Sequence, residues 1–130
     1  MNGTAAHLPP GRTALVIDDD EDFREVAREL LTRAGCRVLE AGTGTAGLAL
    51  LDAGRPDMVI LDINLPDGHG LDVCKGIRLR DRTIPILLCT ALTTKFCEAD
   101  GLAVGATGFL LKPFQRAEFL ERVSTALRLR

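Results

Sequence analysis

The stretch Ala14-Leu15-Val16-Ile17-Asp18-Asp19-Asp20 joins a short apolar run directly to three consecutive acids. Apolar runs of this length without alternation are typical of strands that are buried on both faces of a parallel sheet. The run Met58 to Leu61, which is followed by Asp62, repeats this pattern. The run Ile84 to Cys89, which is followed by Thr90, repeats it again. We therefore predict three central strands, each with a polar residue directly after its last apolar position.

Weaker strands and amphipathic stretches fill the rest of the chain. Arg37 to Ala41 and Gly108 to Leu111 resemble the central strands but are less apolar. Between the strands, apolar residues recur at helical spacing, which predicts five helices that alternate strictly with the five strands. The predicted helices are Phe23 to Ala34, Thr45 to Ala53 with a stop at Gly54, a stretch after Gly70 that includes Arg78, Phe96 to Val104, and Arg116 to Leu129.

The first and fourth predicted helices differ in the strength of their signals. Asp22 and Glu25 have the spacing of a capping box, so we assign Asp22 mainly to capping, and Gly35 supplies the stop. Gly101 lowers the helix propensity of the fourth by ~1 kcal/mol relative to Ala, so we expect that helix to be the least stable. The apolar face predicted for the first helix consists of Phe23, Val26, Ala27, Leu30, Leu31 and Ala34.

Strict alternation of strands and helices predicts an α/β fold, a doubly wound parallel sheet with right-handed crossovers and helices on both faces. The 130 residues are enough to bury one good core, so we expect a single domain. We expect a flexible tail at residues 1–13 and the domain at residues 14–130. The tail has no apolar stretch preceded by basic residues, so it does not resemble a secretory signal.

Composition and charge exclude several classes of function. Although 46% of the residues are hydrophobic, no apolar run approaches the ~20 residues of a membrane span. The formal net charge of -2 gives no electrostatic footprint for nucleic acid, so we expect no direct nucleic-acid binding by this chain. The cysteines form no CxxC pair and have apolar neighbours, which favours core positions in a reducing cytoplasm. They are Cys36, Cys74, Cys89 and Cys97.

Polar residues at the strand ends indicate the chemistry of the site. Ligands of doubly wound sheets bind beyond the carboxyl ends of the strands, where Asp18, Asp19 and Asp62 would meet. Crowded carboxylates favour a bound cation, and ligands that are all oxygen suit Mg²⁺. A carboxylate that touches the ion can act as a nucleophile toward phosphorus. Lys112 and Thr90 could then neutralise and hydrogen-bond the phosphoryl oxygens.

Each of these residues also has a purely structural interpretation. An Asp after a strand is often a helix cap or a turn residue, which applies to Asp18 and Asp20. Taken alone, Lys112 is a solvated loop charge and Thr90 is a turn residue. His69, between two glycines, is a solvated and inert side chain. The functional hypothesis therefore rests on the convergence of strand ends and not on any single residue.

Four motifs at the strand ends form an ordered set that resembles the receiver family of two-component response regulators. The resemblance covers Thr13 to Arg130. It implies a flavodoxin-like (βα)5 three-layer sandwich whose five parallel strands have the order 2-1-3-4-5. The motifs are Leu15-Val16-Ile17-Asp18-Asp19-Asp20, then Val59-Ile60-Leu61-Asp62-Ile63-Asn64-Leu65-Pro66 with Gly70 following, Cys89-Thr90-Ala91, and Phe109-Leu110-Leu111-Lys112-Pro113-Phe114.

The resemblance assigns roles to the residues of the acidic cluster. Asp62 would be the phosphoacceptor and Asp19 a direct Mg²⁺ ligand. Asp18 would reach the ion mainly through water, and the backbone carbonyl of Asn64 would complete the protein's share. The implied function is a cytoplasmic signalling switch and not an enzyme. Such a switch would take its phosphoryl group from a histidine kinase or a histidine phosphotransfer protein.

The remaining roles concern the phosphoryl group and the response to it. Lys112 would pair with that group, Thr90 would hydrogen-bond it, and Phe109 would turn inward when Thr90 moves. A cis peptide bond is expected at Lys112-Pro113, although only about 5 to 6% of bonds before proline are cis. The face of the fourth helix, fifth strand and fifth helix would change conformation and bind a downstream effector or a second copy of the chain.

Three features of the sequence, at four positions, depart from the family pattern. His69 stands where an aspartate is usual, Thr107-Gly108 replaces a common acidic pair, and Gln115 is a poorer helix cap than the usual serine or aspartate. None of them removes an expected site residue. They leave open the subfamily and any dimer that uses acidic residues on the face described above.

Two alternative functions remain open. The same fold could serve as an interaction module that has lost phosphorylation. A phosphatase with an aspartyl-phosphate on the first strand would resemble a DxDx(T/V) pattern, which Asp18 and Asp20 begin but which Asp22 breaks. We discard a calcium loop because Phe23 stands where its sharp turn needs glycine. The chain is either a single-domain regulator or a segment of a longer protein.

Overall fold

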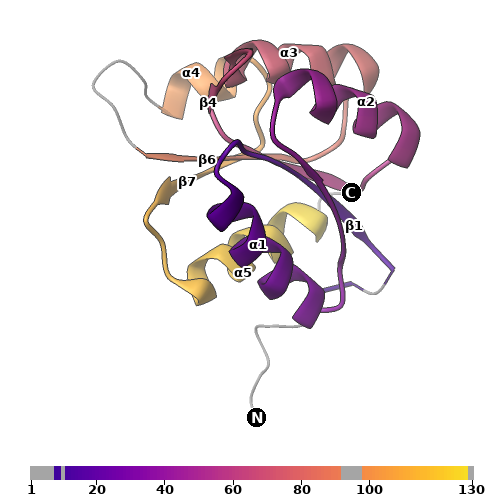
Figure 1. The fold of residues 1–130 in the computed structure, drawn as a ribbon, viewed down its shortest axis with the longest axis vertical. Coiled ribbons are helices and arrows are strands. Elements are labelled where there is room, and N and C mark those ends of the chain that lie inside the picture. The colour runs from indigo at the N-terminus through magenta and orange to yellow at the C-terminus, as the bar shows by residue number, and fades with distance from the viewer. Residues whose placement is uncertain (1–7, 10, 92–97, 129–130) are drawn as a thin grey trace.

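The computed structural model describes residues 8–9, 11–91 and 98–128, which form a three-layer α/β sandwich (Figure 1). The middle layer is a five-stranded sheet in which every neighbouring pair of strands is parallel. Its strands are β1 Thr13–Ile17, β2 Arg37–Ala41, β3 Met58–Leu61, β6 Ile86–Ala91 and β7 Gly108–Lys112. They lie in the order β2-β1-β3-β6-β7. This order confirms the predicted order 2-1-3-4-5, because β6 and β7 are the fourth and fifth strands of this sheet along the chain.

A small hairpin follows β3 and was not predicted. Its strands, β4 (Asn64–Leu65) and β5 (Gly68–His69), pair antiparallel and belong to a separate two-stranded sheet. Two residues are too few to show a hydrophobic period, so sequence patterns could not reveal it.

Helices cover both faces of the sheet, as the alternating pattern predicted. In Figure 1, α1 and α5 lie on one side of the sheet and α2, α3 and α4 lie on the other. Phe96 and Leu129, the expected start of the fourth helix and end of the fifth, lie outside the described residues. The helices are α1 Glu21–Arg33, α2 Gly44–Gly54, α3 Gly70–Arg80, α4 Glu98–Ala103 and α5 Arg116–Arg128.

The start of α1 corrects the sequence analysis. The N-cap is Asp20, whose carboxylate accepts hydrogen bonds from the backbone N–H groups of Asp22 (3.0 Å) and Phe23 (3.4 Å). The assignment of Asp22 to capping was wrong, because the helix begins at Glu21 and Asp22 lies inside its first turn. Val26 was also misplaced. It is 49% exposed, since it lies at the edge of the apolar stripe centred on Ala27.

Two other helix ends use residues that had no assigned role. Arg55, one position beyond the predicted stop, takes the left-handed conformation at φ 44° and donates its N–H to Leu51. His69 is exposed, as expected, but it is not inert. Its Nδ1 accepts a hydrogen bond from the N–H of Leu71 at 3.1 Å, so His69 is the N-cap of α3.

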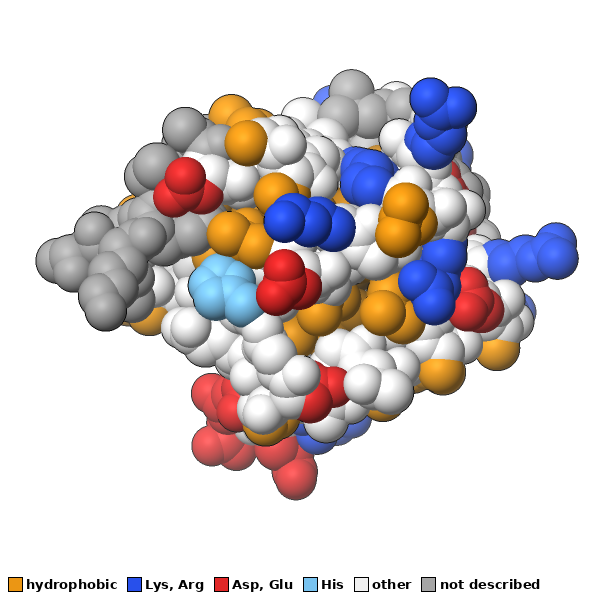
Figure 2. Space-filling model, turned by 90° about the horizontal axis from the view of Figure 1, so that it is seen from above, with side chains coloured by type: hydrophobic (Ala, Val, Ile, Leu, Met, Phe, Trp, Pro, Cys, Tyr) orange, Lys and Arg blue, Asp and Glu red, His pale blue; other side chains and the backbone are white. Residues whose placement is uncertain are grey.

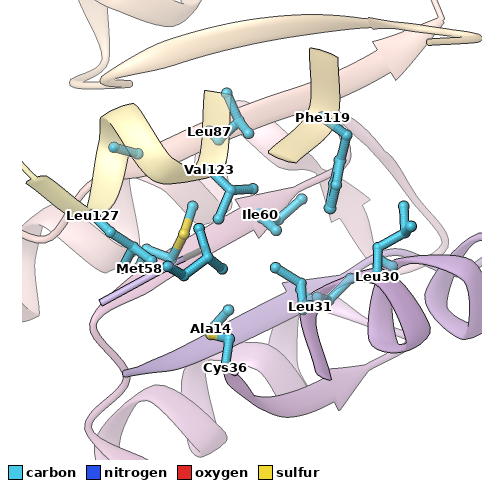
Figure 3. Packing of buried hydrophobic residues seen from close by; sticks show 14 of the residues in the cluster. Ala14, Leu30, Leu31, Cys36, Met58, Ile60, Leu87, Phe119, Val123 and Leu127 are labelled. Carbon is cyan, nitrogen blue, oxygen red and sulfur yellow. The ribbon is translucent and has the colours of Figure 1, made fainter. Parts of the chain in front are cut away.

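The sheet divides the core into two layers. Figure 3 shows the layer in which side chains of α1 and α5 meet those of the central strands. The second layer packs against α2 and α3. Along β1, Ala14 and Val16 belong to the first layer, whereas Leu15 and Ile17 belong to the second. The unbroken apolar run of this strand is therefore explained by burial on both faces.

The cysteines that the structure describes occupy core positions. Cys36, Cys74 and Cys89 are buried and free, as predicted. Burial raises the pKa of Cys36 to about 11 and that of Cys89 to about 12. These thiols are therefore protonated at neutral pH and act as apolar side chains. Cys97 lies outside the described residues.

Part of the segment expected to be a tail contributes to the fold. Leu8 is buried in the first core layer and donates its N–H to the carbonyl of Ala34 at 3.4 Å. Among the described residues, none of the helices combines the length and apolar character needed to span a bilayer. The face over α2, α3 and α4 mixes basic, acidic and hydrophobic side chains (Figure 2).

Candidate functional site

The register of the sheet places two acids side by side. Ile17 at the end of β1 pairs with Leu61 at the end of β3, so Asp18 and Asp62 are the next residues on neighbouring strands. The backbone N–H of Asp62 donates to the carbonyl of Ile17 at 2.9 Å. The N–H of Asp18 donates to Ala41 in β2 at 3.0 Å. Both acids are thus fixed by backbone hydrogen bonds that extend the sheet pairing by one residue.

Three carboxylates gather at this edge. One oxygen from each of Asp18, Asp19 and Asp62 lies within 4.8 Å of the other two. Asp18 is 1% exposed and Asp62 is 7% exposed, whereas Asp19 faces solvent. The convergence predicted from the strand ends is therefore present for the acids. The arrangement gives a negatively charged cluster with an open side at Asp19.

Lys112 brings a positive charge to the cluster from the end of β7. Its Nζ lies 2.6 Å from Oδ2 of Asp18, and it also lies 4.2 Å from the centre of the Phe23 ring. The peptide bond between Lys112 and Pro113 is cis, as the sequence resemblance implied. The interpretation of Lys112 as a solvated loop charge is wrong, because its ammonium is bound to a buried carboxylate.

Asp18 is held by groups that sequence patterns did not reveal. Its Oδ1 accepts a hydrogen bond from the N–H of Asp20 at 2.9 Å, and its backbone carbonyl accepts one from Arg24 at 2.7 Å. Arg24 in turn forms a 3.5 Å ion pair with Glu40 in β2. Arg24 lies in the first turn of α1. Only its nearness in sequence to the three acids could have suggested that it contacts Asp18. These contacts hold in place the Asp18 carboxylate that forms the ion pair with Lys112.

The buried charges shift one another's pKa. Burial and the charge of Asp18 raise the pKa of Asp62, against the opposing effects of Lys112 and of the N–H groups of Asn64 and Ile63. Burial lowers the pKa of Lys112, but the hydrogen bond to Asp18 and the charges of Asp18 and Asp62 outweigh it and raise that pKa. Lys112 therefore stays charged at neutral pH, and Asp62 is a destabilised carboxylate that gains from a cation.

Oxygen ligands dominate the donor set of the cluster. The three carboxylates repel one another because their oxygens lie so close together, and the single ammonium of Lys112 offsets only part of this repulsion. A bound cation would relieve the rest. Neither thiolate nor imidazole belongs to the described cluster. A hard divalent ion such as Mg²⁺ fits such ligands, since it binds through one or two carboxylates and keeps several waters.

Three further predicted residues lie near the cluster in different ways. Thr90 is buried at the carboxyl end of β6, one position before the Ala91 that pairs with Lys112, and its hydroxyl donates to the carbonyl of Ala91 at 3.4 Å. Phe109 pairs with Leu88 and packs, half-buried, against the second core layer. Asn64 is exposed and begins the hairpin that follows Asp62.

Asp67 connects the loop after Asp62 to α2 and was missed by the sequence analysis. Its Oδ1 accepts a hydrogen bond from the N–H of Gly44 at 2.8 Å, and its Oδ2 accepts from the N–H and hydroxyl of Thr45 at 2.9 and 2.8 Å. These bonds lower the pKa of Asp67 to about 2. Asp67 thus supplies a second cap to α2 from a distant loop, beside the N-cap Thr43.

We expect the stability of the wild type relative to an Asp67→Ala variant to depend on pH in a defined window. A lowered pKa means that the carboxylate stabilises the fold fully above its ordinary pKa of 3.8 and loses that effect as pH falls toward about 2. The difference in urea midpoint between the two proteins should be constant from neutral pH to about pH 5 and shrink below that. A difference that stays constant down to about pH 3 would contradict the assignment.

Comparison with known proteins identifies one family. The family model described as response regulator receiver domain matches residues 14–124. Transcriptional regulatory protein CusR of Escherichia coli K12 is 42% identical over 114 residues, which are 88% of this chain and 50% of that protein. The alkaline phosphatase synthesis transcriptional regulatory protein PhoP of Bacillus subtilis 168 is 36% identical, over 88% of this chain and 48% of that protein. The chain therefore spans about half the length of the curated relatives it matches.

Solved structures support the same fold. Chemotaxis protein CheY4 of Vibrio cholerae has a TM-score of 0.83 and 32% identity, covering 88% of this chain and 98% of that chain. The BeF3-activated N-terminal receiver domain of RstA from Klebsiella pneumoniae has a TM-score of 0.84 and 26% identity, covering 90% of this chain and 99% of that chain.

Proposed function

The chain belongs to the response regulator receiver domain family, and from this premise we propose that it is a phosphorylation-dependent switch whose acceptor is Asp62. The observation that carries the proposal is the cluster of Asp18, Asp19 and Asp62 with Lys112 bound to it. Receiver domains are signalling domains, so the chemistry here serves to change the state of the chain and not to turn over a substrate.

Mg²⁺ is the proposed cofactor. Asp19 and Asp62 would bind it directly, Asp18 would reach it mainly through water, and the backbone carbonyl of Asn64 would be the remaining protein ligand. Both oxygens of Asp18 already accept hydrogen bonds, which supports an indirect role for that residue. When bound, the ion neutralises charge on the acceptor and on the phosphoryl oxygens.

The proposed reaction is phosphoryl transfer to Asp62. A carboxylate oxygen attacks phosphorus, the bond from phosphorus to the donor histidine nitrogen breaks, and its electron pair returns to the imidazole. Lys112 pairs with the transferred group and Thr90 donates its hydroxyl to it. Water later attacks phosphorus, the bond to Asp62 breaks, and inorganic phosphate leaves.

The proposed response passes through Thr90 and Phe109. The hydroxyl of Thr90 exchanges its long bond to Ala91 for one to the phosphoryl group, and Phe109 moves inward behind it. The face formed by α4, β7 and α5 then binds a downstream effector or a second copy of the chain. α4 has six residues and contains Gly101, which supports its being an element that moves.

The proposed partner on the donor side is a histidine kinase or a histidine phosphotransfer protein in the cytoplasm. Residues 14–130 are the proposed receiver and residues 1–13 precede it. Asp20 caps α1, which leaves the phosphatase alternative without the second acid of its DxD pattern. An interaction module that has lost phosphorylation would have the same fold, so only the mass measurement described below distinguishes it from the proposed switch.

The test is the mass of the purified chain after incubation with a small acyl phosphate and Mg²⁺. We expect one added phosphoryl group, which hydroxylamine removes because the product is an acyl phosphate. A parallel sample with excess chelator should show no addition. An unchanged mass in the presence of Mg²⁺ would overturn the proposal and favour the interaction module.

A further inference from the structure

The ammonium of Lys112 has two neighbours of different chemistry. One is the Asp18 carboxylate at 2.6 Å, and the other is the face of the Phe23 ring, whose centre lies 4.2 Å from Nζ. A cation within about 6 Å of a ring centre is attracted by the negative face of the ring. The ion pair alone leaves the flexible side chain of Lys112 free to sample several orientations. The ring limits these orientations.

The Phe23 ring is itself held in place by other aromatic residues. The Phe23 and Phe114 rings form an edge-to-face pair with ring centres 5.9 Å apart and planes at 85°, a favourable arrangement for two rings. Phe114 stacks on Phe119 at 5.2 Å and 16°, and Phe119 is fully buried in α5. The ring beneath the ammonium is thus supported through Phe114 by a residue of the rigid core.

We propose that Phe23 is a positioning residue, whose ring face holds the Lys112 ammonium beside Asp18 and Asp62 for phosphoryl transfer. This inference rests on the proposed function and names a residue that acts through Lys112. A leucine at position 23 would fill much of the same volume but would lack the negative face. The proposal therefore differs from simple packing in a way that an experiment can resolve.

The first test does not depend on phosphorylation. Protons above an aromatic face resonate upfield, so the ε-methylene protons of Lys112 should be shifted upfield in the wild type and return toward ordinary values in Phe23→Leu. A Phe23→Tyr variant should keep the upfield shift because it keeps the ring face, whereas Phe114→Leu should weaken the shift because Phe114 supports the Phe23 ring. Lys112 resonances that do not change in Phe23→Leu would overturn the proposal.

A double-mutant cycle measures the strength of the contact. Phe23→Leu and Lys112→Met, singly and together, should show a coupling equivalent to about a two- to fivefold change in the unfolding equilibrium constant. Coupling that is zero within error would contradict an attraction between the ring and the ammonium.

The kinetic test uses the same variants with a small acyl phosphate. Phe23→Leu should lower the maximal labelling rate at saturating Mg²⁺ by about two- to fivefold. It should leave the Mg²⁺ concentration at half-maximal rate unchanged, because Phe23 acts through Lys112, which is not a proposed ligand of the ion. Phe23→Tyr should restore most of the rate, and Phe23→Leu should have no further effect in a Lys112→Met background.

The two hypotheses fail separately. If Asp62 accepts no phosphoryl group while the upfield shift and the coupling are present, the proposed function is wrong and the contact between Phe23 and Lys112 stands. If labelling is normal but Phe23→Leu changes neither the Lys112 resonances nor the maximal rate, Phe23 is a packing residue only.

Discussion

An Asp62→Asn variant will show no mass increase with Mg²⁺ and a small phosphodonor, and in metal-free buffer it will unfold at a higher urea concentration than the wild type. The first effect follows because the amide cannot act as the nucleophile toward phosphorus. The second follows from the raised pKa of Asp62, which is due to burial and to the charge of Asp18. Labelling should fall to background.

The sign of the stability effect follows from linkage. For an acid whose pKa is raised by folding, the favourable contribution is present below its ordinary pKa of 3.8 and is lost as pH rises through the folded value. At neutral pH the wild type therefore carries the cost of a charged, buried Asp62. Asparagine removes that cost, so the gain in urea midpoint should shrink as pH is lowered toward 3.8.

A matched control is Asp52→Asn, which changes the same functional group at an exposed position. Asp52 pairs with Arg80 at 3.1 Å, and such exposed pairs contribute ~0–1 kcal/mol. Labelling of this variant should equal that of the wild type. Mg²⁺ should raise the urea midpoint of the wild type and of Asp52→Asn but have less effect on Asp62→Asn. Retained labelling in Asp62→Asn would show that another residue is the acceptor.

The central sheet and its acidic edge were predictable because their signals are local. An apolar run such as Met58 to Leu61 marks a doubly buried strand, and the residue after it must emerge at the carboxyl edge. Parallel register then brings Asp18 and Asp62 together without any further information. The same rule predicted the position of Lys112, because Lys112 ends β7, a parallel strand two positions from β3 in the same sheet.

The contacts that the sequence did not reveal are of two kinds. Some join residues that are distant in the chain, and others depend on whether a helix begins one or two residues earlier or later. Asp67 lies 23 residues from Gly44, and nothing in either local pattern indicates that they meet. Phe23 was assigned to an apolar helix face, which is correct as packing, but its place beneath Lys112 depends on how α1 and β7 approach. Asp20 and Asp22 are both plausible caps, and only the backbone decides between them.

Replacing Gly70 with alanine should destabilise the fold and slow labelling more than any other glycine change in α3. A Cβ at this first residue of α3 would clash with the carbonyl oxygen of Asp62 and would lie 2.5 Å from Cα of Ile63. Both neighbours are backbone atoms, so the methyl group cannot be accommodated by a side-chain rotation. Overpacking of this kind costs about 1–3 kcal/mol, and we expect the upper part of that range.

The same displacement should affect the reaction, because the backbone that must move carries Asp62. A shift near 1 Å in a reacting group can cost about 100-fold in rate, so labelling of Gly70→Ala should be slower by a factor of this order. The measurements are urea unfolding and the labelling rate at saturating Mg²⁺, at a temperature where the variant is folded.

Gly76→Ala in the same helix is the control. Its added methyl would meet mainly the mobile ends of Leu48 at 3.3 Å and would gain up to ~1 kcal/mol of helix propensity. If Gly70→Ala and Gly76→Ala behave alike, the close approach of α3 to the acceptor strand does not control the position of Asp62.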